Sequence, residues 1–136
     1  MFLIDTYVVS ELAKPRPNLQ VQRWASVRID TAFMSSVTVG EIIKGIERLP
    51  SGKRRTALEL WLTALTSRAF KARLLPVDDV VAAEWGRISA AARRTLPCAD
   101  SLLAATARVH NLTVATRNER DFSELGVRVL NPWSSP

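Results

Sequence analysis

With 136 residues, 47% of them hydrophobic and 24% charged, the chain is long enough for one folded domain and too short for two. No apolar run approaches the roughly 18 residues needed to cross a bilayer, the first residues lack the features of a signal peptide, and a single cysteine excludes an internal disulfide. The net charge of +6 favours polyanionic partners, and it equally fits a solvated basic surface. We therefore expect a cytoplasmic protein without membrane association, folded as one domain over residues 1–136 with a frayed tail over 132–136.

The N-terminal residues predict a buried strand followed at once by a helix. Residues 2–4 form an unbroken apolar run, which is typical of a strand buried on both faces of a parallel sheet. Thr6 is the predicted cap of a helix that ends before Pro15. Asp5 stands at the strand exit, where open α/β sheets place their reactive groups. At this point of the chain, Asp5 is either a functional carboxylate or a simple helix cap.

The next segments place a second carboxylate near the first. Asn18 is a predicted cap for a helix that reaches Val27, and residues 32–34 form a second buried strand. The following helix carries Glu41 on its first turns. If the two strands are parallel neighbours joined by a right-handed crossover, Glu41 lies near the same sheet edge as Asp5.

The remaining segments continue the alternation of strands and helices. A long helix is predicted over residues 53–70, with an apolar stripe that serves either the core or a dimer face. Further helices begin near Asp79, ending around Arg94, and at Pro97, with Asp100 in the first turn. Three further short strands are predicted over residues 73–77, 112–115 and 127–130. This alternation predicts an α/β three-layer sandwich with a mostly parallel central sheet.

Four acids occupy comparable places in this pattern: Asp5, Glu41, Asp100 and Asp121, the last just past the strand over 112–115. Bringing these carboxylates together is costly because like charges oppose burial, and a divalent cation removes the conflict. Oxygen ligands suit Mg²⁺, with Mn²⁺ as an alternative. Such a site typically hydrolyses phosphodiesters, because the metal lowers the pKa of a bound water and stabilises charge on the phosphoryl group. Thr6, Thr116 and Asn118 are candidates to orient the ligands or the water.

Four segments resemble the sequence motifs of PIN-domain ribonucleases, and most closely those of the VapC and FitB type of bacterial toxin. They are Leu-Ile-Asp-Thr-Tyr-Val-Val-Ser-Glu-Leu, Ser-Ser-Val-Thr-Val-Gly-Glu-Ile, Pro-Cys-Ala-Asp-Ser-Leu-Leu-Ala-Ala-Thr-Ala and Val-Ala-Thr-Arg-Asn-Glu-Arg-Asp-Phe. The segments occur in the order expected for the family and span nearly the whole chain. This resemblance implies a PIN-like α/β fold, dependence on Mg²⁺ or Mn²⁺, and endonucleolytic cleavage of RNA. It also implies a homodimer, within a larger assembly in some cases, and neutralisation by a cognate, DNA-binding antitoxin encoded upstream.

The resemblance also assigns residues. Asp5, Glu41 and Asp100 fall on the acidic ligands of the family and Asp121 on its fourth acidic position, while Thr116 and Asn118 fall on polar positions of the last motif. One position departs from the family pattern. Tyr7 stands where an asparagine usually follows the Asp-Thr pair, so its ring either narrows the pocket, stacks on a base or turns aside into an apolar contact.

These observations predict a Mg²⁺- or Mn²⁺-dependent endoribonuclease that serves as the toxin of a toxin–antitoxin pair. Two alternatives remain open from the sequence. One is an RNA-binding or partner-binding module in which Tyr7 has weakened catalysis. The other is an aspartyl phosphatase or phosphotransferase with Asp5 as the nucleophile, although that chemistry commonly needs a second acid where Tyr7 stands.

Overall fold

The computed structural model describes residues 1–134, and a short parallel sheet lies at its centre. Strands β1 (Phe2–Ile4), β4 (Thr113–Ala115) and β5 (Val129–Leu130) pair in the order β1-β4-β5. Strands β2 (Met34–Ser35) and β3 (Leu74–Leu75) form a second parallel pair, which a parallel bridge between Leu3 and Phe33 joins to β1. Every pairing is parallel, so the carboxyl ends of the strands meet at one edge.

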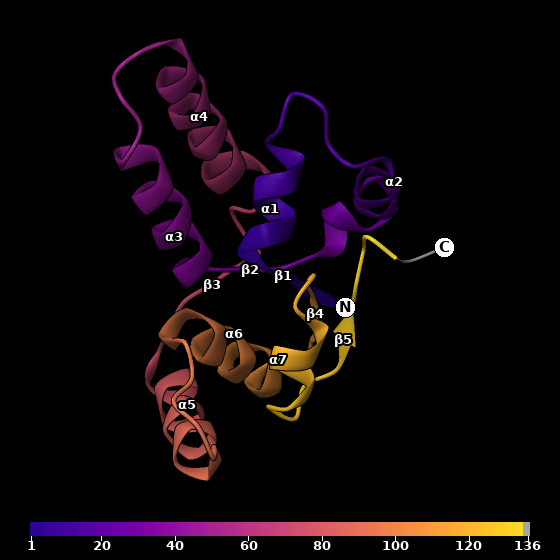
Figure 1. Cartoon of the computed structure of the whole chain (residues 1–136), viewed down its shortest axis with the longest axis vertical. Helices are drawn as coiled ribbons and strands as arrows, with labels where there is room; N and C mark the ends of the chain where they lie inside the picture. Colours follow the sequence, from indigo (N-terminus) through magenta and orange to yellow (C-terminus); the bar gives the residue numbers. More distant parts are fainter. Residues whose placement is uncertain (135–136) are drawn as a thin grey trace.

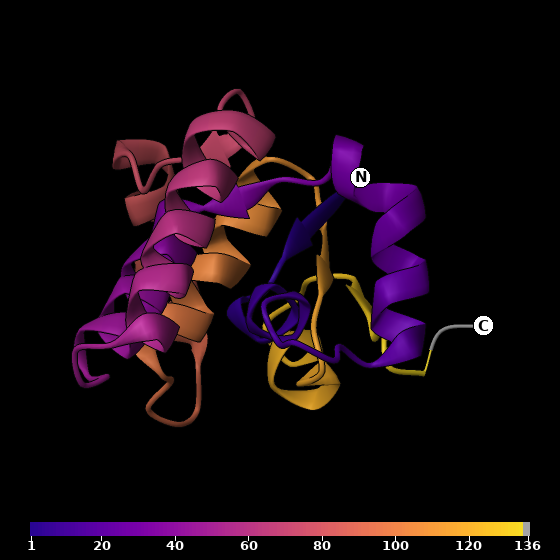
Figure 2. The same cartoon turned by 90° about the horizontal axis from the view of Figure 1, so that it is seen from above.

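Helices cover both faces of this sheet (Figure 1; Figure 2). In Figure 1, one group lies above the strands and the other below. The first group comprises α1 (Thr6–Leu12), α2 (Leu19–Arg28), the 3₁₀ turn η1 (Ile29–Thr31), α3 (Ser36–Glu47), α4 (Lys53–Ala64) and the π-helical turn η2 (Leu65–Ala69). The second comprises α5 (Asp79–Ala91), α6 (Cys98–Val109) and α7 (Glu119–Ser123).

The side chains of the central strands explain this layering. Ile4 and Ala115 belong to an apolar core on the side of α1 to α4, whereas Leu3 and Val114 belong to a separate core on the side of α5 to α7. Successive residues of a strand point to opposite faces, so an unbroken apolar run fills both cores at once. The expected α/β sandwich with a parallel sheet is confirmed.

Helix caps follow the sequence pattern with one correction. Asn18 Oδ1 accepts hydrogen bonds from the backbone of Gln20 and Val21, as expected for a cap of α2. At α1, however, Asp5 is the cap and Thr6 is the first helical residue. The prediction that Thr6 caps this helix is wrong, because the Asp5 carboxylate accepts a 2.7 Å hydrogen bond from the Thr6 backbone nitrogen.

Two helix ends also differ from expectation. The helix predicted over 53–70 is α-helical only to Ala64 and closes with η2, in which the Phe70 nitrogen donates to Leu65 O. The π-helical turn leaves Phe70 fully buried in the first core. Helix α5 ends at Ala91 and not near Arg94, because its buried residues end at Ile88 and nothing apolar holds the next turn. The strands begin and end within about two residues of their predicted limits.

The C-terminal segment is held more firmly than a frayed tail. Pro132 is buried, the Trp133 backbone nitrogen donates to Asn131 Oδ1 at 2.9 Å, and the Trp133 ring packs against the first core. The Arg117 guanidinium lies over this ring, 5.1 Å from its centroid. The expectation of fraying is therefore wrong for residues 132–134, and residues 135–136 lie outside the described part of the chain. No helix within residues 1–134 is long and apolar enough to span a membrane.

Candidate active site

The four acids singled out from the sequence line one cavity of about 610 Å³. Asp5 follows β1, Glu41 lies in the second turn of α3, Asp100 in the first turn of α6, and Asp121 on α7 after β4. Parallel pairing brings these segments to the carboxyl edge of the sheet, so residues far apart in sequence converge there. The cavity is also lined by Thr6, Tyr7, Ser10, Pro97, Ala99 and Asn118.

Asp5 lies at the floor of this cavity and is only 2% exposed. One carboxylate oxygen accepts from the Thr6 backbone nitrogen, and the other accepts a 2.8 Å hydrogen bond from the Thr116 hydroxyl. Burial raises the pKa of Asp5 to about 6; these two hydrogen bonds oppose the rise, and the charges of Asp100 and Glu41 add to it. Asp5 is thus a helix cap and also a carboxylate whose ionised form is disfavoured by burial and by neighbouring negative charges.

Thr6 connects the first and second acids. Its hydroxyl donates a 2.6 Å hydrogen bond to Glu41 Oε1 and lies 3.3 Å from the hydroxyl of Thr38, which is fully buried. This is the contact through which Thr6 would orient an acid. Thr38 was not predicted, although its position three residues before Glu41 on the same helix places both on one face.

Asp100 and Asp121 form the other side of the cavity. Burial raises the pKa of Asp100, the charges of Glu41 and Asp121 raise it further, and the charge of Arg94 opposes them. Asp121 is more exposed, and its Oδ1 accepts a 3.4 Å hydrogen bond from Arg94 Nη2. Sequence alone does not single out Arg94, because an adjacent pair such as Arg93 and Arg94 in a connecting segment is typical of a solvated surface.

The remaining predicted residues complete the cavity wall. The Asn118 backbone nitrogen donates a 3.0 Å hydrogen bond to the Thr116 hydroxyl, so the turn after β4 supports the Thr116 to Asp5 contact. Tyr7 lines the cavity with 56% of its surface exposed, so its ring has not turned aside into the core. Ser10 was not predicted, although it follows Thr6 by four residues on α1.

The chemistry of this donor set fits a hard divalent cation. Every candidate ligand is a carboxylate, and oxygen ligands of this kind suit Mg²⁺ or Mn²⁺. Burial and the neighbouring acids raise the pKa of Asp5, and a bound cation would favour its ionised form. Within residues 1–134, no three Asp, Glu, His or Cys side chains have the spacing of an assembled metal site. Glu41 is held by Thr6 and Asp121 by Arg94, so side-chain rotation would be needed for the acids to converge on one ion.

Comparison with known proteins gives a consistent result. Residues 2–127 match the family model described as PIN domain. The chain is 38% identical over 137 residues to Toxin FitB of Neisseria gonorrhoeae, covering 98% of this chain and 99% of that protein. It is 35% identical over 137 residues to VapC ribonuclease Y4jK of Sinorhizobium fredii, covering 98% of each.

Solved structures agree over the full length. The crystal structure of FitAcB from Neisseria gonorrhoeae superposes with a TM-score of 0.88 at 36% identity, covering 99% of this chain and 100% of that chain. The structure of FitAB bound to an IR36 DNA fragment superposes with a TM-score of 0.90 at 34% identity, covering 100% of this chain and 98% of that chain.

Proposed function

The chain belongs to the PIN-domain family, within which its relatives include FitB and VapC toxins, and from this premise we propose that it is a metal-dependent endoribonuclease and the toxin of a toxin–antitoxin pair. The family membership expected from the four motifs is thereby confirmed. One observation carries the proposal: Asp5, Glu41, Asp100 and Asp121, from four separate segments, line a single cavity.

The proposed site has defined tasks for each residue. Asp5, Glu41 and Asp100 would hold Mg²⁺ or Mn²⁺, with Asp121 as a fourth acidic group. When bound, such an ion would lower the pKa of water and offset negative charge on the phosphoryl group. Thr116 orients the Asp5 carboxylate through its hydroxyl group, and Thr6 holds Glu41 at the cavity wall, from which its side chain would turn to reach the ion.

The Thr116 hydroxyl favours the ionised form of Asp5, which is the form that binds a cation. A hydrogen bond from a hydroxyl stabilises the ionised carboxylate, and in the buried site of Asp5 this opposes the effect of burial. Water is largely excluded from Asp5, which strengthens its electrostatic interaction with any cation. No serine, cysteine or histidine nucleophile is required by this scheme.

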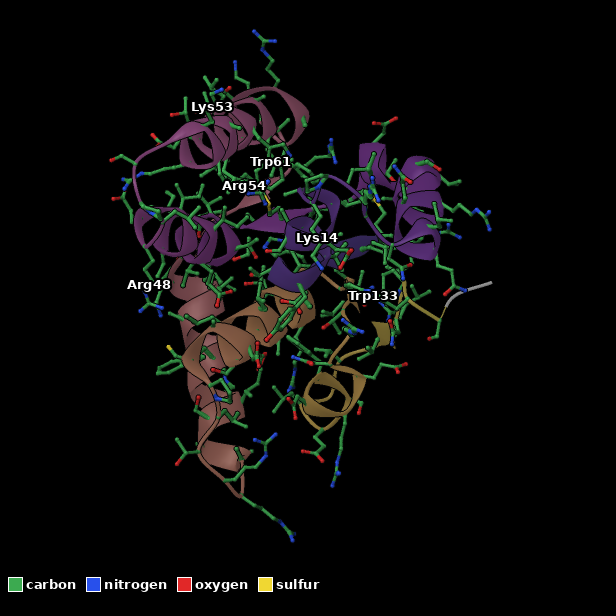
Figure 3. The ribbon with its side chains drawn as sticks, turned by 45° about the horizontal axis from the view of Figure 1, so that its top comes forward. Lys14, Arg48, Lys53, Arg54, Trp61 and Trp133 are labelled. Carbon is green, nitrogen blue, oxygen red and sulfur yellow. The ribbon has the colours of Figure 1, made fainter. Side chains whose placement is uncertain are left out.

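We extend the proposal to partners. The solved FitAB structure is bound to a DNA fragment, which supports a DNA-binding antitoxin as the partner of this chain. We propose in addition that this antitoxin is encoded upstream. Helix α4 exposes Leu60 and half-buries Trp61, which Figure 3 labels, and we propose this helix as part of a homodimer face. Larger toxin–antitoxin assemblies would follow from such a dimer.

The experiment is RNA cleavage by the purified chain with Mg²⁺, compared with the Asp5→Asn and Asp100→Asn variants. Both variants should reduce cleavage by at least about a hundredfold, because each removes a charged ligand. Both should also lose the rise in melting temperature that Mg²⁺ gives the unaltered protein. Asp30→Asn is the matched control, because Asp30 is an exposed acid on η1 outside the cavity. Undiminished cleavage by both variants would remove the proposed site.

One observation favours the second candidate, a catalytically weakened RNA-binding module. Tyr7 occupies the cavity wall with more than half of its surface exposed, where it could obstruct close approach of a phosphodiester. This candidate predicts that RNA and Mg²⁺ both bind while single-turnover cleavage stays undetectable, and that Tyr7→Asn creates activity. Cleavage by the unaltered chain would exclude it.

A further inference from the structure

One arginine, Arg94, forms an ion pair with an acid that lines the cavity. Arg94 lies in the connecting segment between α5 and α6, and its Nη2 is 3.4 Å from both Asp121 Oδ1 and Glu124 Oε2. Asp121 lines the cavity, whereas Glu124 is the C-cap of α7 and is not among the residues that line it. The guanidinium is therefore held beside the acids by two carboxylates of one short helix.

These contacts are too weak to explain Arg94 as a structural residue. Its side chain is 48% exposed, both distances are long, and exposed ion pairs of this kind contribute about 0 to 1 kcal/mol. Among the hydrogen bonds of residues 1–134, Arg94 uses only Nη2, which leaves its Nε and Nη1 hydrogens directed to no protein acceptor. The arrangement orients the group while leaving donors accessible.

The charge of the cavity explains why such a group is useful. The four carboxylates carry four negative charges when ionised, and one Mg²⁺ would neutralise two of them. An approaching phosphodiester would therefore still meet net negative charge. A guanidinium binds phosphate through two parallel hydrogen bonds and stays charged at every physiological pH. A cation beside the cavity therefore offsets this repulsion.

Other basic residues lie less favourably. Figure 3 shows Arg48, Lys53 and Arg54 on the α3–α4 side of the molecule, and Lys14 on α1, where it pairs with Glu11. Within residues 1–134, Arg94 is the basic side chain that forms an ion pair with an acid of the cavity.

We propose that Arg94 binds a non-bridging oxygen of an RNA phosphate beside the acid cavity, and that Asp121 and Glu124 position its guanidinium for that contact. The proposal rests on the proposed nuclease function and adds a substrate-binding residue to it. It also gives Asp121 a task besides metal binding, because this carboxylate faces Arg94 on one side and the cavity on the other.

The test measures binding and cleavage separately. A short fluorescein-labelled single-stranded RNA is titrated with the protein in Ca²⁺, followed by fluorescence anisotropy at several salt concentrations, and KM and kcat are measured in Mg²⁺. Arg94→Ala should weaken binding about tenfold and raise KM more than it lowers kcat. The slope of log affinity against log salt should fall by about 0.7, the value for one lost phosphate contact on a single strand. A purely structural role would not change that slope.

Three variants complete the comparison. Arg93→Ala removes the same charge from the neighbouring exposed position, so it should change affinity and slope much less. Glu124→Gln loosens the guanidinium without altering the cavity lining, so affinity should fall two- to threefold with the slope retained. Arg94→Lys should keep the slope and lose part of the affinity, because an ammonium lacks the two-point geometry.

The outcomes separate this inference from the nuclease proposal. Equal effects of Arg94→Ala and Arg93→Ala, or an unchanged slope for Arg94→Ala, would overturn the role of Arg94 even if Asp5 and Asp100 prove essential for cleavage. Binding that depends on Arg94 without any cleavage by the unaltered protein would support the phosphate contact and reject the nuclease. Failure of the unaltered protein to bind RNA would overturn both.

Discussion

The side chains of Asp5 and Thr116 meet although 111 positions separate them in the sequence, and the Thr116 hydroxyl donates a 2.8 Å hydrogen bond to Asp5 Oδ2. The contact follows from the pairing of β1 with β4, in which Ile4 is the register partner of Ala115. Each of the two polar residues comes directly after its strand, so the register fixes their distance. Both side chains are buried, so their relative position is determined by the pairing of β1 with β4.

We expect Thr116→Val to reduce Mg²⁺-dependent cleavage by about ten- to a hundredfold, as losses of partners that orient metal ligands commonly do. Valine keeps the volume of threonine but removes both the donor to Asp5 and the acceptor for the Asn118 nitrogen. Steady-state cleavage and a Mg²⁺ titration measure the effect. Thr116→Ser is the control, because it retains the hydroxyl and should retain most of the activity; equal losses in both variants would contradict the assigned role of the hydrogen bond.

A second prediction concerns stability in metal-free buffer. The pKa of Asp5 is raised from its ordinary value of 3.8 to about 6, so the folded state binds this proton more tightly than the unfolded state does. The stabilisation of the folded state that comes from this tighter proton binding is fully present below pH 3.8 and is lost as pH rises through 6. Between these two limits, the contribution of Asp5 to the free energy of unfolding changes by about 3 kcal/mol.

Asp5→Asn should therefore raise the free energy of unfolding by about 1 to 3 kcal/mol at pH 8 in EDTA, and change it little at pH 4. Urea unfolding at the two pH values provides the measurement. The Asp30→Asn variant, at an exposed acid, should show no such difference between pH values. A variant that is less stable than the unaltered protein at pH 8 would show that Asp5 contributes to folding mainly as the cap of α1.

The sequence was sufficient to predict the layers and the convergence of the acids. Short apolar runs such as residues 2–4 have no polar alternation, which specifies burial on both faces, and parallel strands necessarily direct Asp5 and its partners to one edge. The metal role of Asp5, Glu41, Asp100 and Asp121 stays a prediction, as do the RNA substrate and the single domain over residues 1–136.

Features that depend on the shape of the core or on side-chain geometry were not predictable. Both Asp and Thr are good helix caps, so the sequence does not determine which of Asp5 and Thr6 is the last residue with extended backbone before α1. The π-helical turn before Phe70 depends on where that ring fits the core. Contacts such as those of Thr38 and Arg94 join side chains from separate elements, and no local pattern encodes them.

A third prediction concerns the junction of α1 and α2. Glu11 is a buried carboxylate whose oxygens accept from Lys14 Nζ at 2.9 Å and from the Asn18 backbone nitrogen at 3.0 Å. The hydrogen bond from Lys14 is the main reason that the pKa of Glu11 is lowered, followed by that from Asn18. The contribution of Glu11 to the free energy of unfolding is therefore present above pH 4.5 and is lost as pH falls through the lowered pKa of Glu11.

Glu11→Gln should lower the free energy of unfolding by about 1 to 2 kcal/mol at pH 7, and the difference should disappear in strong acid. Denaturant unfolding across pH measures both effects. Glu59→Gln on α4 is the matched control, because Glu59 also pairs with a basic residue but is exposed, so its loss should cost less than about 0.5 kcal/mol. Equal costs for the two variants would mean that burial of Glu11 adds nothing to the junction.

The last prediction concerns Tyr7, whose ring lines the cavity with 56% of its surface exposed. A ring in this position is available to stack on a base of the bound strand, and such stacking is worth about 1 to 3 kcal/mol per base. Tyr7→Ala should therefore raise KM for RNA about tenfold or more while leaving the melting temperature within about 2 °C of the unaltered protein, because little buried surface is lost.

Tyr7→Phe separates stacking from hydrogen bonding by the phenol. Phenylalanine keeps the aromatic face and removes the hydroxyl, so its KM should stay within about twofold of the unaltered value. If Tyr7→Phe loses as much as Tyr7→Ala, the hydroxyl is the functional group and stacking is not. If Tyr7→Ala instead cleaves faster with unchanged KM, the ring obstructs the site and does not stack on a base, because a smaller side chain then lets the phosphodiester approach Asp5 and Asp100 more closely.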